Sequence, residues 1–163
     1  IGSDFIMNVC KTWEKCFYEQ NVPHTRKIVL RMAITLGIEG GVILRFKNLV
    51  RFGLGGKMSH GQQMMSWVHV EDIARSIEFL AANENLNGIF NISSPYPLNN
   101  DAFMRAIRKA MGMPIGISTP RWFLAFGAFL IGTETELIMK SRWVIPQKLI
   151  AAGFHLSIRK LRM

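Results

Sequence analysis

His69 and Asp72 are the two side chains whose types and spacing best suit proton transfer. They form an H-x-x-D pair where an expected strand meets an expected helix, so the imidazole and the carboxylate could act as acid and base or share one hydrogen bond. In the alternative, Asp72 caps the helix by accepting a backbone N–H, and His69 bonds nearby backbone. We favour this structural role.

A second polar group follows the glycine-rich stretch Gly53–Gly56. Gln62, Gln63 and Ser66 stand beside the aromatic Trp67. Amides and a hydroxyl can orient a polar organic ligand while an indole ring supplies apolar area, so this combination suits a binding pocket. The alternative is that Trp67 belongs to the hydrophobic core. Spacing alone does not separate the two.

The segment Gly37–Gly41 lies between an expected strand and an expected helix, where phosphate-binding loops occur. It lacks the G-x-G-x-x-G spacing, and Glu39 would face the phosphates. We therefore expect a turn and a helix start there. His24, His60 and His155 show no ligand spacing with one another or with carboxylates, so no metal site is expected.

Strands and helices are expected to alternate along the chain, which predicts an α/β fold. Periodic apolar residues indicate a first helix ending near Glu19; Cys10 and Cys16 lie too far apart on it for a disulfide and are expected to be reduced and buried. The later expected elements are strands at Lys27–Ile34, Ser66–Val70 and Gly88–Ser93 and helices at Val42–Arg51, Asp72–Ala82 and Asn99–Met111.

The texture of the sequence changes at Pro114. Two prolines and the apolar segment Arg121–Ile131 follow, and Pro146 and Gly153 suit the start and end of a short helix. We therefore expect two units, a main α/β unit over residues 1–113 and a small helical appendage over residues 114–163.

The composition is that of a folded protein and narrows the partners. Of the 163 residues 49% are hydrophobic and 19% charged, and the net charge of +9 is concentrated after residue 100. No basic motif interleaved with aromatics indicates nucleic-acid binding. The longest apolar run is about ten residues, whereas a membrane span needs roughly 20. We expect a cytoplasmic protein that binds neither nucleic acid nor membrane.

Several short motifs occur in a specific order and spacing. They are Trp13-Glu14, Leu36-Gly37, Gly53-Leu54-Gly55-Gly56, Gly61-x-Gln63-x-x-Ser66-Trp67-Val68-His69-Val70-x-Asp72, Gly88-x-x-Asn91, Ser141-Arg142-x-x-x-Pro146-x-Lys148-Leu149 and Gly153-Phe154. Together they resemble the extended short-chain dehydrogenases, in the NAD(P)-dependent epimerase/dehydratase-like branch that has a small C-terminal domain of unknown function.

This resemblance implies that residues 1–113 are the C-terminal portion of a Rossmann-like fold, whose glycine-rich cofactor loop would precede Ile1. The first helix would then be the one that carries Tyr-x-x-x-Lys in the family. Registering on Glu14 puts Ile6 and Cys10 where the Tyr and Lys would stand. Neither can do their acid–base work, so no catalytic residue is assigned.

The resemblance also implies a cofactor, NAD or NADP, and a substrate cleft. Met65 stands where sugar-nucleotide epimerases carry an Arg that binds the diphosphate, which favours a small, neutral, polar substrate. The expected cofactor-binding residues are Met32, Ala33 and Ile34, and the expected substrate-binding residues are Gly41, Leu44, Gln63, Ser66 and Trp67.

Three functions remain open. The first is an NAD(P)-dependent oxidoreductase or epimerase-like protein of which this chain is an inactive fragment. The second is a dinucleotide-binding scaffold or sensor without catalysis. The third, more remote, is a basic nucleic-acid-binding module built on Arg105–Lys109 and the tail from Arg142 to Arg162. The strand Lys27–Ile34 would lack sheet neighbours in the fragment, so the chain is a possible homo-oligomer.

Overall fold

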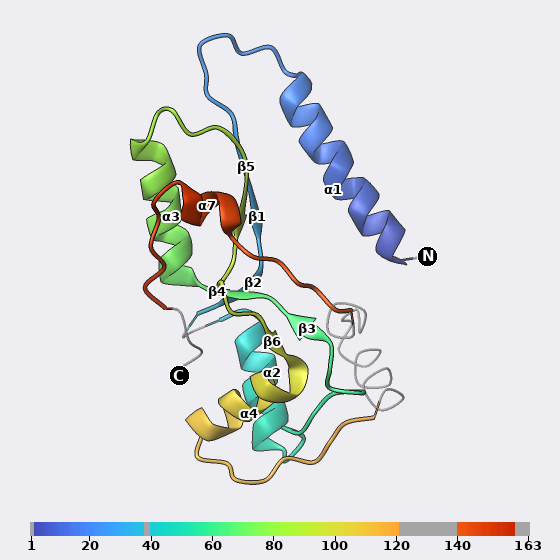
Figure 1. The fold of residues 1–163 in the computed structure, drawn as a ribbon. Helices are drawn as coiled ribbons and strands as arrows, with labels where there is room; N and C mark the ends of the chain where they lie inside the picture. Colours follow the sequence, from blue (N-terminus) through green and yellow to red (C-terminus); the bar gives the residue numbers. More distant parts are fainter. Residues whose placement is uncertain (1, 38–39, 121–139, 159–163) are drawn as a thin grey trace.

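The computed structural model describes residues 2–37, 40–120 and 140–158, and its centre is built from two parallel strand pairs (Figure 1). β1 (Ile28–Met32) pairs with β5 (Gly88–Ile92), and β2 (Ile34–Leu36) pairs with β4 (Trp67–His69). Parallel neighbours need crossover connections, which the intervening helices supply. The predicted α/β class is confirmed.

Ala33 separates β1 from β2 and marks where the chain changes partners. Its N–H donates to the carbonyl of Ile92 at the end of β5, whereas the N–H of Ile34 donates to the carbonyl of Ser66 just before β4. The chain therefore leaves β5 and joins β4 within two residues. A third, antiparallel pair joins β3 (Met64–Met65) to β6 (Leu98–Asn99).

The lower half of the molecule in Figure 1 is held by two helices, α2 (Val42–Arg51) and α4 (Asn100–Ala110). Both lie close to their expected bounds. Phe46 and Phe103 meet edge to face with ring centroids 5.2 Å apart, and the buried ring of Trp67 belongs to the same core. Phe103 sits on the apolar stripe of α4 that its spacing predicts.

The glycine-rich stretch Gly53–Gly56 is a packing feature. Ile117 donates its N–H to the carbonyl of Gly53 and accepts the N–H of Gly56. A Cβ at Gly56 would lie 2.5 Å from the backbone of Ile117 and Ser118, so only glycine lets the two segments approach this closely.

The upper half contains α3 (Val70–Ala82) and α7 (Gln147–Ala151) around β1 and β5. Leu149 of α7 is fully buried in a core with Phe90 and Phe154. Gly153 follows the helix with φ of 94°, the left-handed conformation expected of a glycine that ends a helix. The segment Arg121–Ile131 lies outside the described residues.

The first helix, α1 (Gly2–Glu19), extends beside β1 and β5 (Figure 1), and most of its described apolar side chains are exposed. Trp13 is 70% exposed, and Cys10 and Cys16 are both exposed; the prediction of buried thiols was wrong. Polar contacts attach this helix instead. The Lys27 ammonium donates to carbonyls at its C-terminal end, including that of Phe17 at 2.8 Å.

Among the helices of the described ranges, none has the length and apolarity needed to cross a bilayer.

Candidate functional site

A cleft of about 940 Å³ opens at the carboxyl end of β1. One wall is formed by Met32, Ala33 and Ile34, where the chain changes strand partners, together with Asn91 of β5. The opposite wall comes from residues 142–151, which approach from the far end of the chain. Ligands of open parallel sheets bind outside the carboxyl ends of the strands, next to such changes of partner. The position therefore suits a binding site.

Two buried serines fix the wall contributed by the C-terminal segment. The Ser66 hydroxyl accepts the N–H of Val144 at 2.7 Å and donates to the carbonyl of Arg142 at 2.8 Å. The Ser93 hydroxyl donates to the carbonyl of Val144 at 3.1 Å. The N–H of Arg142 donates to the carbonyl of Met64. Both polar backbone groups of Arg142 and of Val144 are thus held, and the side chains between them project from a fixed backbone.

Three basic residues line the cleft, and two of them are engaged. Arg31 forms a bidentate ion pair with Glu14 of α1, with N–O distances of 2.7 and 2.6 Å. This hydrogen bonding lowers the pKa of Glu14 and raises that of Arg31. The Lys148 ammonium donates to the carbonyl of Asn87 at 2.5 Å and lies 4.1 Å from the centroid of the Phe90 ring.

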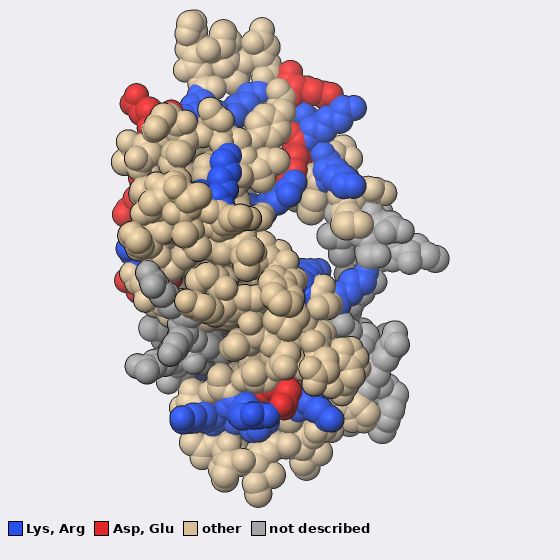
Figure 2. Space-filling model, viewed as in Figure 1, with Lys and Arg blue, Asp and Glu red and all other residues tan. Residues whose placement is uncertain are grey.

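The third basic residue is Arg142, which is exposed. No hydrogen bond or ion pair joins its guanidinium to any residue that the structure describes. Figure 2 shows this face of the molecule hollowed between α1 and the lower half, with Lys and Arg side chains above and below the hollow. The cleft wall therefore carries a positive charge available to a ligand.

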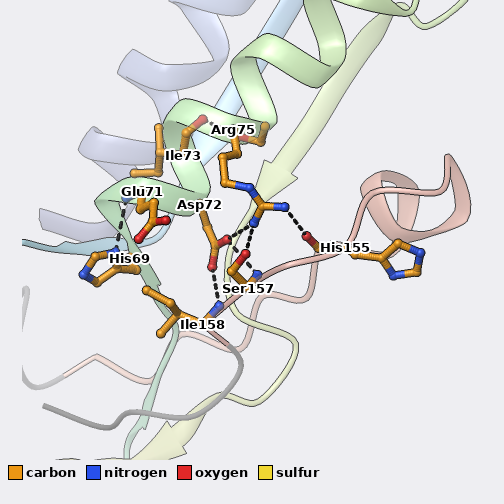
Figure 3. Close-up of polar contacts among 9 residues, drawn as sticks. His69, Glu71, Asp72, Ile73, Arg75, His155, Ser157 and Ile158 are labelled. Carbon is orange, nitrogen blue, oxygen red and sulfur yellow. Dashed lines mark hydrogen bonds and ion pairs between the residues drawn. The ribbon is translucent and has the colours of Figure 1, made fainter.

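His69 and Asp72 serve the fold (Figure 3); His69 bonds nearby backbone as expected, whereas the role of Asp72 differs from the expected one. His69 is the N-cap of α3, and its Nδ1 accepts the N–H of Glu71 at 3.2 Å. Asp72 is buried within the first turn and accepts the N–H groups of Ser157 and Ile158 at 2.8 and 3.0 Å. The expectation that Asp72 caps the helix was wrong, because the histidine one turn earlier takes that position.

Arg75 completes this cluster. Its guanidinium donates to Oδ1 of Asp72 at 2.9 Å and to the carbonyl of His155 at 3.2 Å, and it also contacts the Ser157 hydroxyl. The carboxylate therefore fastens the end of the described chain to α3. Over the described ranges, no three His, Cys, Asp or Glu side chains are grouped to hold a metal ion.

The chain matches known proteins over most of its length. No family model matches it. It is 29% identical over 160 residues to an epimerase family protein of Staphylococcus aureus, covering 98% of this chain and 52% of that protein. It is 32% identical over 156 residues to an epimerase family protein of Mycobacterium leprae, covering 94% of this chain and 50% of that protein.

Solved structures agree. The human epimerase family protein SDR39U1, solved with NADPH, superposes with a TM-score of 0.83 at 26% identity, over 94% of this chain and 51% of that one. UDP-glucose 4-epimerase of Thermus thermophilus, solved with NAD, gives 0.59 at 16% identity, over 96% and 48%. The chain is related to the epimerase-like extended short-chain dehydrogenases. It spans about half the length of the curated relatives it matches.

Within this epimerase-like fold, the expected site residues separate into two groups. Met32, Ala33, Ile34 and Ser66 line the cleft, although both Ser66 hydrogen-bonding directions are used by the opposite wall. The described lining does not include Gly41, Leu44, Gln63 or Trp67.

The second group lies in or beside the core. Gln63 is buried and donates from Nε2 to the carbonyl of Met58. Trp67 is buried and donates from Nε1 to the carbonyl of Tyr96. Gly41 is the N-cap of α2, and Leu44 lies in the first turn of that helix with an exposed side chain.

Sequence reasoning missed Arg142 and Trp143, which the structure brings into the cleft. Their motif was recognised, but it was assigned to the appendage and not to the site. No signal in the sequence pointed to them, because the burial of Ser66 and Ser93, whose hydroxyls then need hydrogen-bond partners, is known only from the structure. Cys10, which stands at the position of the Lys in the Tyr-x-x-x-Lys motif of the resembling family, has an exposed side chain on α1.

Proposed function

We propose that the intact protein containing this chain binds NAD or NADP and acts as an oxidoreductase or epimerase on a small polar molecule. The observation that carries the proposal is the cleft at the carboxyl end of β1, where the chain passes from β5 to β4. Parallel sheets of this kind bind dinucleotides at such an edge. Likeness to a structure that contains NADPH supports the choice of cofactor.

The residues present fit one side of a cofactor site. Met32 is 59% exposed at the carboxyl end of β1, so an apolar side chain is available to a nicotinamide ring. No G-x-G-x-x-G loop occurs in the 163 residues, and the pyrophosphate requires such a loop at a helix N-terminus. When bound, the cofactor would supply hydride transfer, and the residues around Met32 would orient it.

A dinucleotide-binding scaffold or sensor is the second candidate. It is favoured by the residues at the expected catalytic positions of α1, because Ile6 and Cys10 cannot supply the proton transfer of a Tyr/Lys pair. The two candidates share cofactor binding and differ in turnover.

Titration of the intact protein with NADH and NADPH, followed by nicotinamide fluorescence, tests both candidates. We expect saturable binding of at least one dinucleotide by the intact protein and none by residues 1–163 alone. Binding of neither cofactor by the intact protein would overturn the proposal. Turnover over a panel of small hydroxy and carbonyl compounds then separates enzyme from sensor.

The nucleic-acid alternative depends on basic side chains, and some of these already have partners within the protein. Arg105 pairs with Asp101 within α4, and Arg108 donates to the carbonyl of Gly55 at 2.5 Å. If this alternative held, affinity for random duplex DNA would fall steeply with salt as counterions are released.

A further inference from the structure

We infer that the cleft selects a substrate bearing an anionic group, which Arg142 binds while Trp143 packs against the adjoining part of the molecule. This inference rests on the proposed function and names the class of substrate. It differs from the neutral substrate expected from the sequence, because the segment that supplies both residues was not part of the expected cleft.

The charge of the cleft is the first argument. The described residues that line it include Arg31, Arg142 and Lys148 and no Asp or Glu. Glu14 neutralises Arg31, and Lys148 is held against a carbonyl and an aromatic ring. Arg142 alone combines exposure with a guanidinium that no described residue contacts. A planar guanidinium binds carboxylate or phosphate through two parallel hydrogen bonds.

The rigidity of the backbone is the second argument. Ser66 and Ser93 hold the residues on either side of Trp143 through three hydrogen bonds of 2.7 to 3.1 Å. These buried hydroxyls therefore fix the backbone that carries two exposed side chains, those of Arg142 and Trp143. Because this backbone is already fixed, the segment loses less conformational entropy when it engages a ligand.

The exposed indole is the third argument. Trp143 is 70% exposed although it lines the cleft. An indole offers a large rigid apolar face with few rotatable bonds. The Arg142 guanidinium, which no described residue pairs with, and this indole together provide the two contacts needed by a small organic anion with an apolar or planar body.

Binding of two probe anions tests the inference. Inorganic phosphate and benzoate are titrated into the intact protein by calorimetry, with and without saturating NAD(P)H, and NADPH affinity is measured in parallel. We expect Arg142→Ala to weaken at least one anion tenfold or more and to leave the NADPH dissociation constant unchanged. Trp143→Ala is expected to weaken benzoate more than phosphate.

Arg51→Ala is the matched control, because Arg51 is exposed in the last turn of α2 and does not line the cleft. The inference is overturned if the wild type binds neither probe, or if the two arginine variants behave alike. A loss of NADPH affinity without loss of anion affinity would assign Arg142 to the cofactor phosphates and also overturn it. The anions are also titrated without cofactor, so a failure to bind anions can be distinguished from a failure to bind the dinucleotide.

Discussion

Removal of the Asp72 carboxylate should release the C-terminal segment from α3. Asp72→Ala deprives the N–H groups of Ser157 and Ile158 of their acceptor and leaves the Arg75 guanidinium without its ion pair. Hydrogen bonds to a charged group contribute about 1.5–3 kcal/mol each. The Arg75 side chain is 38% exposed, so its pair adds at most about 1 kcal/mol.

These contributions predict a loss of about 3–7 kcal/mol in the free energy of unfolding for Asp72→Ala. Asp72→Asn should lose roughly half as much, because the amide oxygen still accepts one N–H. Urea unfolding measures the total, and hydrogen exchange at Ser157 and Ile158 locates it. Asp101→Asn is the matched control: Asp101 also lies in a first helical turn and pairs with an arginine, but it is partly exposed and should cost under about 1 kcal/mol.

Exchange at these two amides should accelerate in the Asp72 variants and not in the control. The anchoring role is refuted if the free energy of unfolding of Asp72→Ala lies within about 0.5 kcal/mol of the wild-type value, which is roughly the error of such comparisons, while the Ser157 and Ile158 amides stay protected from hydrogen exchange.

The other predictions concern the glycine contact and the ion pair of α1. Gly56→Ala should lower the free energy of unfolding by about 1–3 kcal/mol, because the added Cβ overpacks the contact. Gly40→Ala is the control: nothing lies within 4 Å of its added Cβ, and it should lower the free energy of unfolding by under about 1 kcal/mol. Equal unfolding midpoints for the two variants would contradict this prediction. Glu14→Gln should lose up to about 1 kcal/mol at pH 7. Because Arg31 lowers the pKa of Glu14, the stability that this carboxylate contributes is fully present above the unfolded pKa of about 4.3 and disappears as the pH falls through the lower folded pKa. The stabilities of wild type and variant should therefore converge once the pH is below the folded pKa of Glu14; a gap that does not narrow as the pH falls refutes the assignment.

Sequence reasoning located the helices of the core well, because their signal is local. The apolar spacing that ends at Arg51 and the glycine at 153 both act within a few residues, and α2 and the end of α7 follow them. The family resemblance likewise rested on short motifs in a fixed order, and the relatives bear it out.

Burial and long-range pairing were harder to predict. Cys10 and Cys16 of α1 were expected to be buried, yet periodicity says only which residues share a face and not what packs against it, and both thiols are exposed. Asp72 was expected to cap its own helix, because a cap is a local signal, while its partners lie 85 and 86 residues further along the chain. No local pattern announces such a contact.

The order of synthesis gives the serine contacts a further consequence. Ser66 and Ser93 bond backbone groups of Val144, which lies 78 and 51 residues further along the chain, so this wall of the cleft can form only after residue 144 has left the ribosome. Contacts of such high sequence separation form late, since the loop between them must be closed first. A product that stops before residue 141 would therefore lack this wall of the cleft.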